Sequence, residues 1–313
     1  SSFFKQTSGV PQGSVLGPLF FAIYIDDLTK KLNVRYLLYA DDLKIYRHVL
    51  TLEDCNNLQR NIQMIETGLW DCNMQLNSDK CRTVSYTRKT EYLQFNYVIG
   101  GTIVKRSETV KDMGIIFDNK LTFRNHVEAI VSSAYKSLGF IIRSTTQFKD
   151  QQALLILYKS FVRSKLEYAC LVWSPIYYTH AWSLEKVQRR LCKTFIFRCT
   201  GEYPIRGSPH ENLLQYVQLP SLAKRRKYYS IKFLSQILNY EVDCPYLLSK
   251  ISLRIPSFNY RSYNLFHLET ARTNALAMSP VHQIVSAYLT QKLDADIFAL
   301  RRADLRSLAA PGI

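Results

Sequence analysis

The chain has 313 residues, of which 47% are hydrophobic and 21% charged, a balance that excludes a wholly disordered protein and is long enough for two domains. Its 41 Lys and Arg exceed its 25 Asp and Glu by a net charge of +16, so polyanions are the expected partners, nucleic acid ahead of a membrane surface. The seven cysteines are scattered, odd in number and without a C-x-x-C pair, which favours a reducing compartment. The longest apolar stretch, residues 15–25, is too short to span a bilayer.

The charge is distributed unevenly along the chain. Residues 1–118 hold 14 basic and 13 acidic side chains, whereas residues 119–313 hold 27 basic and 12 acidic ones. An acidic site beside a cationic body is what an enzyme acting on nucleic acid requires. The chain also opens without Met, directly before a dense motif, so we expect a fragment whose N-terminal part is missing.

The first 118 residues predict a mixed α+β region. A loop rich in Gly and Pro, residues 7–13, leads into a helix that Ser14 is placed to cap. The apolar face expected for this helix consists of Leu16, Leu19, Phe20 and Ile23. Two β-prone runs, 36–40 and 43–46, predict a hairpin with Asp41 and Asp42 at its tip.

An amphipathic helix and further strands are expected next. The apolar residues of the helix recur at intervals of four, three and four: Leu58, Ile62, Ile65 and Leu69. Residues 81–118 predict strands, with a hairpin turn at Gly100-Gly101.

From about residue 122 the pattern becomes helical and stays so. We expect helices at 122–143, 150–172 and 181–198, then a linker rich in Gly and Pro at 201–209. A further helix should carry the basic run Lys224-Arg225-Arg226-Lys227. The sequence therefore predicts an α+β front and an all-helical back.

Asp41 and Asp42 are the candidate catalytic residues. Two adjacent carboxylates on a tight turn supply the oxygen ligands that a divalent metal needs for phosphoryl or nucleotidyl transfer. An isolated Asp-Asp pair is also common in solvated turns. Because the flanking runs are largely apolar, we expect this turn to project from a buried sheet.

Together these segments resemble a known family. The loop and helix start TSGVPQGSVLGPL (7–19), followed by Tyr-Ala-Asp-Asp (39–42), is similar to the palm of reverse transcriptases encoded by non-LTR, LINE-type retrotransposons of the jockey-like group, from the second conserved motif onward. Residues 76–81 resemble the family's fourth motif, and 110–115 its primer grip, with Met-Gly where Leu-Gly is usual. Residues 157–173 resemble its helical thumb, and the likeness fades beyond residue 200.

The resemblance implies a fold and a domain organisation. It implies an α+β protein that begins with a partial right-hand polymerase palm, an antiparallel sheet with helices, over residues 1–118 including the primer grip. An all-helical thumb would follow over 119–200, and a basic, mostly helical C-terminal extension over 201–313.

The resemblance also implies roles for particular residues. Asp41 would bind a catalytic metal, with Asp42 in a weaker or indirect role, and two Mg²⁺ ions, with Mn²⁺ as the alternative, would serve as cofactors. Lys80 would lie near the incoming triphosphate and act as a general acid. The nucleotide and template would contact Pro11, Gln12, Gly13, Tyr39 and Ala40. The primer grip would consist of Met113 and Gly114.

Several of these residues have simpler interpretations. Lys80 is equally an ordinary surface lysine, and sequence alone favours Met113 as a core residue. A set of basic residues on the 181–198 helix is expected to contact phosphates. The simpler interpretation is that these residues form a solvated face that serves solubility. The members of this set are Lys186, Arg189, Arg190, Lys193 and Arg198, and the run 224–227 is interpreted in the same way. A zinc knuckle is excluded, because Cys192, Cys199 and His210 match no short knuckle spacing.

The expected function is that of an RNA-directed DNA polymerase that transfers nucleotides to a primer 3′-OH. Its partners would be an RNA template, a DNA primer and deoxynucleoside triphosphates, in the nucleus or a cytoplasmic ribonucleoprotein, neither secreted nor in a membrane. The family's first palm motif, which supplies another metal-binding aspartate, would lie before Ser1, and Asp26-Asp27 is expected to be a surface pair rather than its replacement. We therefore expect the chain alone to be inactive. The alternatives are a non-catalytic nucleic-acid-binding remnant and an RNA-dependent RNA polymerase.

Overall fold

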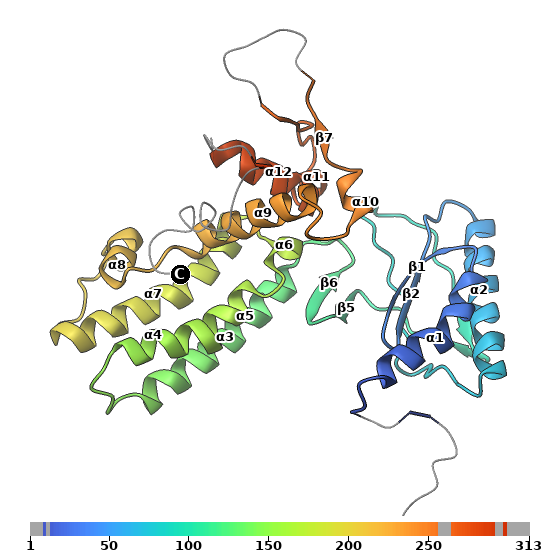
Figure 1. The fold of residues 1–313 in the computed structure, drawn as a ribbon, viewed down its shortest axis with the longest axis horizontal. Coiled ribbons are helices and arrows are strands. Elements are labelled where there is room, and N and C mark those ends of the chain that lie inside the picture. The colour runs from blue at the N-terminus through green and yellow to red at the C-terminus, as the bar shows by residue number, and fades with distance from the viewer. Residues whose placement is uncertain (1–8, 11–12, 256–263, 292–296, 299–313) are drawn as a thin grey trace, which may run out of the picture. The chain divides into compact units, whose positions relative to one another are not determined.

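The computed structural model describes residues 9–10, 13–255, 264–291 and 297–298, and it divides into two compact units, Ser1–Val110 and Lys111–Ile313 (Figure 1). Within the described residues both units combine helices with short two-stranded sheets, in agreement with the expected α+β class. The boundaries 1–118, 119–200 and 201–313 remain predictions.

The described residues of the N-terminal unit form two helices and two hairpins. Its elements are α1 (Gly17–Lys30), β1 (Arg35–Tyr39), β2 (Asp42–Tyr46), α2 (Leu52–Asp71), β3 (Val98–Ile99) and β4 (Thr102–Ile103). The N-cap position of α1 is Leu16 rather than Ser14, but the Ser14 hydroxyl accepts a hydrogen bond from the Gly17 backbone N–H at 3.1 Å, and Pro18 lies in the first turn.

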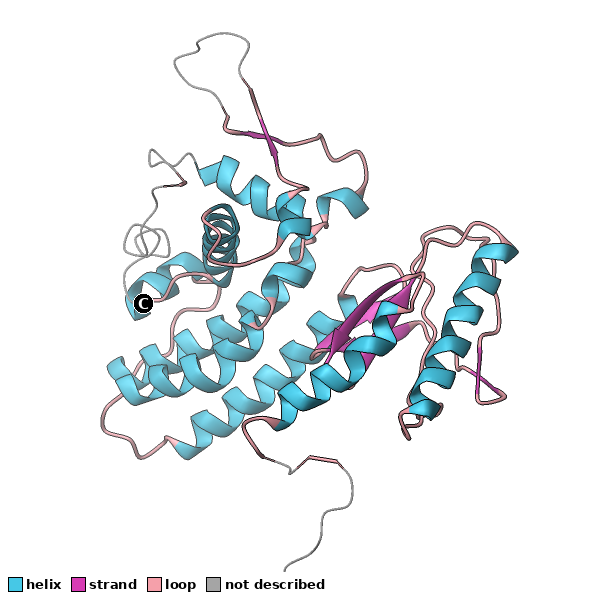
Figure 2. Ribbon diagram, turned by 45° about the vertical axis from the view of Figure 1, so that its right-hand side comes forward, coloured by secondary structure: helices cyan, strands magenta, loops and turns pink. Residues whose placement is uncertain are grey.

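The predicted apolar face of α1 is wrong. Leu16, Leu19, Phe20 and Ile23 are all more than half exposed. Instead Ile25 and Leu28 are buried in a small core with α2 and one face of the β1–β2 hairpin. Figure 2 shows the helices of this unit beside the magenta strands of the hairpin. The helix GPLFFAIYIDDLTK is apolar on almost every side, so helical spacing alone does not identify the side that packs.

Helix α2 follows the predicted pattern. Ile62, Ile65 and Leu69 are buried, and its start carries a capping box in which Thr51 and Asp54 each accept from the other's backbone N–H. The hairpin turn at Gly100-Gly101 is confirmed, with positive φ angles of 55° and 74°. Most of 81–97 lies outside the strands, apart from a bridge between Thr83 and Arg106.

The C-terminal unit is mostly helical. Strand β5 (Thr109–Asp112) contains the boundary between the two units, and it pairs with β6 (Ile115–Asp118). The elements that follow are α3 (Arg124–Ser144), α4 (Gln152–Tyr158), η1 (Lys159–Arg163, a π-helical segment), α5 (Ser164–Glu167), α6 (Cys170–Trp173), α7 (Tyr178–Thr200), α8 (His210–Val217), α9 (Leu222–Leu238), α10 (Pro245–Leu248), β7 (Ser252–Leu253), β8 (Phe266–His267), α11 (Asn274–Ala277) and α12 (Pro280–Gln291).

Two of the three long helices expected after residue 122 are confirmed. α3 and α7 match 122–143 and 181–198, whereas the helix expected at 150–172 is interrupted. It changes to π-helical geometry at η1 and breaks at Ala169, whose φ is 49°. Neither change is marked by Gly or Pro, so no local residue pattern predicts it.

The core of this unit lies between α3, the α4–α5 segment and α7, which are side by side in Figure 1. The apolar face predicted for α7 is confirmed: Leu184, Val187, Leu191 and Phe195 are all buried. Helices α9 and α12 share a second, smaller core. None of the helices in the described part of the chain is long and apolar enough to cross a membrane.

Candidate functional site

The Asp-Asp pair lies where the β1–β2 hairpin turns. Tyr39 pairs with Asp42, so Ala40 and Asp41 form a two-residue turn, and Ala40 has a left-handed φ of 51°. Asp41 is therefore at the tip, as expected, whereas Asp42 is the first residue of β2.

The sheet behind the turn is less buried than predicted. One face of the hairpin, with Leu38, Leu43 and Ile45, packs on the core of the N-terminal unit. The other face is open to solvent, with Leu37 at 58% and Tyr39 at 61% exposed. The described structure packs α1, α2 and the β3–β4 region against the Ile45 side of this sheet, whereas its second face stays exposed at Leu37 and Tyr39.

Both carboxylates are exposed and offer hard oxygen ligands of the kind that Mg²⁺ prefers. Among the described residues no group of three or more His, Cys, Asp or Glu side chains could hold a metal ion. Asp41 and Asp42 are of a chemical type that fits a divalent metal, and two carboxylates are fewer than the six or more oxygen ligands that such an ion usually takes.

The loop before α1 is described in part. Pro11 and Gln12 lie outside the described residues. Gly9 and Gly13 have φ angles of 79° and 82°, which residues other than glycine rarely adopt. A Cβ atom added at either glycine would meet nothing within 4 Å. These two glycines are required by backbone conformation, and the space beside them is open.

Lys80 lies in a turn of the N-terminal unit, shortly after Leu76. Leu76 packs against the core of that unit, and the Lys80 backbone N–H donates to the side-chain oxygen of Asn77 at 3.1 Å. The Lys80 side chain is exposed. The fold therefore presents this lysine on the same unit as the Asp-Asp turn.

Met113 and Gly114 form the turn between β5 and β6, in the C-terminal unit. Their φ angles are 43° and 84°, both left-handed, and Met113 is 48% exposed rather than in the core as its residue type favoured. The Tyr168 hydroxyl donates to the Met113 carbonyl at 3.0 Å. Tyr168 was not singled out from the sequence, and no local pattern connects two residues 55 positions apart.

The basic residues of α7 differ in their availability. Lys186 and Arg190 are exposed, and the Arg190 guanidinium lies 6.0 Å from the Tyr135 ring centroid. Arg189 donates to the Ser208 carbonyl at 2.5 Å, and the Lys193 ammonium lies 5.6 Å from the Tyr203 ring centroid. Lys186 and Arg190 are the members of this set most accessible to phosphates.

Three arginines that were expected to contact phosphates are instead buried or hydrogen-bonded within the unit. Arg198 donates to the carbonyls of Ile142 and Thr145, at the C-terminal end of α3, where cations stabilise a helix. Arg225 and Arg226 are 3% and 6% exposed. Because the run 224–227 lies on a helix, only Lys224 and Lys227 face the solvent.

Arg225 is held by the Glu167 carboxylate, whose side chain is 10% exposed. Its Nη2 atom donates to Glu167 Oε2 at 2.9 Å, and its Nε atom donates to the other oxygen. Burial alone would lower the pKa of Arg225, but the Glu167 carboxylate more than offsets this and raises it. Glu167 and Arg225 are therefore a structural ion pair between α5 and α9.

Comparisons with known proteins agree with the geometry. Residues 1–97 match the family model described as reverse transcriptase (RNA-dependent DNA polymerase). The chain is 25% identical over 198 residues to the RNA-directed DNA polymerase from mobile element jockey of Drosophila funebris, a match that covers 59% of this chain and 21% of the relative.

Two further relatives come from Drosophila melanogaster. The probable RNA-directed DNA polymerase from transposon X-element is 26% identical over 195 residues, which is 59% of this chain and 21% of that protein. The jockey polymerase of that species is 27% identical over 139 residues, 42% of this chain and 15% of the relative.

The matched region spans about a fifth of the length of the first of these curated relatives. No solved structure matches the chain. The glycine loop and the Tyr-Ala-Asp-Asp turn agree with these matches: residues 1–97 are similar to the reverse transcriptase family, and the chain is similar to jockey-like RNA-directed DNA polymerases.

Proposed function

We propose that this chain takes part in RNA-templated DNA synthesis as the later part of a polymerase palm, a thumb and a basic extension. The observation that carries the proposal is the position of Asp41 at the tip of a two-residue turn, on the segment that matches the reverse transcriptase family. An RNA template, a DNA primer and deoxynucleoside triphosphates are the substrates, and the site of action is the nucleus or a cytoplasmic ribonucleoprotein.

The carboxylates of Asp41 and Asp42 hold a divalent metal, Mg²⁺ or Mn²⁺, together with ligands from outside the described residues. When bound, such ions lower the pKa of a primer 3′-OH and neutralise the triphosphate in a two-metal site. Because the carboxylates stand on a short hairpin that is fixed to α1 and α2 on one face, they are preorganised for this purpose.

Other residues position the nucleic acid and the nucleotide. The open backbone at Gly13, with Pro11, Gln12, Tyr39 and Ala40, lies under the templating base pair, and Lys80 approaches the triphosphate. Met113 and Gly114 hold the primer end, and Tyr168 supports this turn through its hydrogen bond to the Met113 carbonyl. Lys186 and Arg190, with Arg189 and Lys193 beside them, contact phosphates.

The test is RNA-templated extension of a DNA primer by a protein that carries these residues together with the upstream palm segment. We expect Asp41→Asn to abolish extension while RNA binding stays unchanged, because the substitution removes a metal ligand and leaves the fold intact. Asp27→Asn is the control, since Asp27 is also exposed but pairs with Lys30 on α1. Extension that survives Asp41→Asn would contradict the proposal.

A binding remnant without catalysis is the second candidate. It is favoured by the absence, within the described residues, of a third metal-ligating side chain near the Asp pair. Failure of the longer protein to extend a primer with either metal, while it still binds RNA, would support this alternative. A clear preference for ribonucleotides over deoxynucleotides would instead indicate an RNA polymerase.

A further inference from the structure

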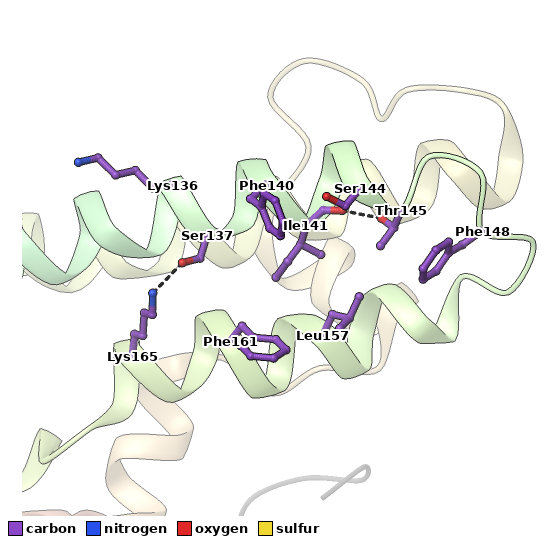
Figure 3. A pocket seen from close by; sticks show the side chains of 10 residues that line it. All are labelled: Lys136, Ser137, Phe140, Ile141, Ser144, Thr145, Phe148, Leu157, Phe161 and Lys165. Atoms are coloured by element: carbon purple, nitrogen blue, oxygen red, sulfur yellow. Dashed lines mark hydrogen bonds between the residues drawn. The ribbon is translucent and has the colours of Figure 1, made fainter.

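A groove lies on the surface of the C-terminal unit, between α3 and the α4–η1–α5 segment. It encloses about 460 Å³, which suits one planar group and is too small for a helix 10–12 Å wide (Figure 3). Ile141 and Leu157 form its apolar floor, and Phe140, Phe148 and Phe161 stand around it. These residues are 65%, 45% and 58% exposed, so more than half of the surface of Phe140 and Phe161 remains available for a ligand.

The charge at the groove is entirely positive. Lys136 and Lys165 are both exposed and lie at one end, and the residues that line the groove include no acid. The Lys165 ammonium donates to the Ser137 hydroxyl at 2.7 Å, a neutral partner that leaves its charge uncompensated. The ligand that complements the groove therefore combines a flat apolar group with an adjacent negative charge.

The backbone at Phe161 is a second, independent observation. Phe161 lies in η1, where the helix changes from α to π geometry. Short π-helical segments are rare and concentrate at functional sites. The irregular turn presents an aromatic ring to solvent in a helix whose neighbouring residues, Tyr158 and Val162, are fully buried.

We propose that this groove binds an unpaired base of single-stranded RNA or DNA. The base stacks on Phe161 and Phe140, which project from opposite sides of the groove, and Lys165 and Lys136 contact the flanking phosphates. The choice of nucleic acid as ligand rests on the proposed function, but no part of this site involves Asp41 or a metal. A peptide with acidic and apolar side chains has the same two properties and is the alternative that the experiment separates.

The experiment measures binding of a labelled oligo-deoxythymidylate to the 313-residue chain by fluorescence anisotropy. We expect Phe161→Ala and Phe140→Ala each to weaken binding about tenfold, the size of one lost base–aromatic stack. Phe161→Leu keeps the apolar bulk without the flat ring and should weaken binding to the same extent. The matched controls are Ile156→Ala and Phe197→Ala, which remove exposed apolar side chains outside the groove and should leave affinity unchanged.

Two further measurements identify the ligand. An oligonucleotide without bases should bind the original chain and Phe161→Ala equally, because only the phosphates remain. Lys165→Ala should reduce the slope of log affinity against log salt by about 0.7, as expected for one phosphate contact on a single strand.

The proposal is overturned if the phenylalanine variants bind the oligonucleotide as tightly as the original chain. It is also overturned if Phe161→Leu retains full affinity, or if only a glutamate-rich peptide shows dependence on Phe161. These outcomes leave the proposed polymerase function intact, because that function is judged by Asp41 and primer extension. Loss of extension in Asp41→Asn conversely gives no support to the groove.

Discussion

At the scale of single residues, the interior of the C-terminal unit contains more positive than negative charge around Glu167. This carboxylate pairs with Arg225, lies 3.8 Å from Arg163 Nε and accepts a hydrogen bond from Tyr229 at 3.4 Å. Nη1 atoms of Arg163 and Arg225 are buried without a hydrogen-bond partner among the described residues. The single carboxylate is therefore the main compensation for the buried Arg225 and the largely buried Arg163.

Glu167→Gln should destabilise the protein by about 3 kcal/mol, because it leaves Arg225 buried without its counter-charge. The free energy of unfolding, measured by urea denaturation, tests this. Glu128→Gln is the control: Glu128 pairs with Arg124 on the surface, and its loss should cost less than about 0.5 kcal/mol. Equal effects of the two substitutions would show that Glu167 is not the compensating charge.

His126 should make stability depend on pH. It is 2% exposed, its Nδ1 atom accepts from the Ile116 backbone N–H at 3.3 Å, and it packs against Trp173. Burial lowers the pKa of His126, so the unfolded chain binds a proton more readily than the folded protein. The stabilisation is thus complete above about pH 6.5, the usual pKa of histidine, and is lost as the pH falls below it.

The measurement is the free energy of unfolding between about pH 7.5 and 5. We expect it to fall with decreasing pH in the original chain and to fall less steeply in His126→Gln, which keeps an acceptor but cannot be protonated. An unchanged slope in the variant would assign the pH dependence to other groups.

At the scale of elements, the β5–β6 turn is defined by its backbone. Two consecutive left-handed residues match the two-residue hairpin turn that is usually formed by Asn-Gly. At Gly114 a Cβ atom would also come within 3.2 Å of Tyr168 Cε1. The turn therefore requires glycine at its second position and tolerates Met113 at its first with some strain.

Gly114→Ala should destabilise the protein by about 1 kcal/mol, because alanine is disfavoured at positive φ. Met113→Asn should stabilise it by about 0.5 kcal/mol, since asparagine accepts the left-handed conformation more readily. Thermal unfolding of both variants tests the pair. Opposite signs are expected, and destabilisation by Met113→Asn would show that the methionine side chain contributes contacts that outweigh the strain.

The sequence alone was sufficient to predict the buried faces of two helices and the position of one turn. The apolar faces of α2 and α7 were predicted correctly because each helix has one apolar stripe among polar residues, Ile62 and Ile65 in one and Leu184 and Val187 in the other. The buried face of α1 was predicted wrongly, because this helix has apolar residues on nearly every side. The tip position of Asp41 follows from the two β-prone runs that flank it. The contact of Tyr168 with the Met113 carbonyl depends on tertiary packing and has no local signal.

At the scale of the whole molecule, the net charge of +16 overstates the cationic surface. Arg198 and Arg225 are hydrogen-bonded inside the C-terminal unit, Arg226 is buried there, and exposed Lys30 is paired with Asp26 at 2.6 Å. Sequence arithmetic counts these charges with the rest, because it does not distinguish a buried guanidinium from a free one. Whether a cationic side chain is free to bind a phosphate depends on the contacts that it makes in the structure.

Binding of an RNA–DNA duplex by this chain should therefore weaken steeply with salt, and only the exposed cations should contribute to the slope. Each phosphate contact adds about 0.9 to the slope of log affinity against log salt. Lys186→Ala and Arg190→Ala should each reduce it by about that amount, because both side chains are exposed on α7. Lys30→Ala is the matched control, since its charge is already paired. A slope that neither α7 variant changes would mean that the basic face of α7 serves solubility, and that the phosphates are bound elsewhere.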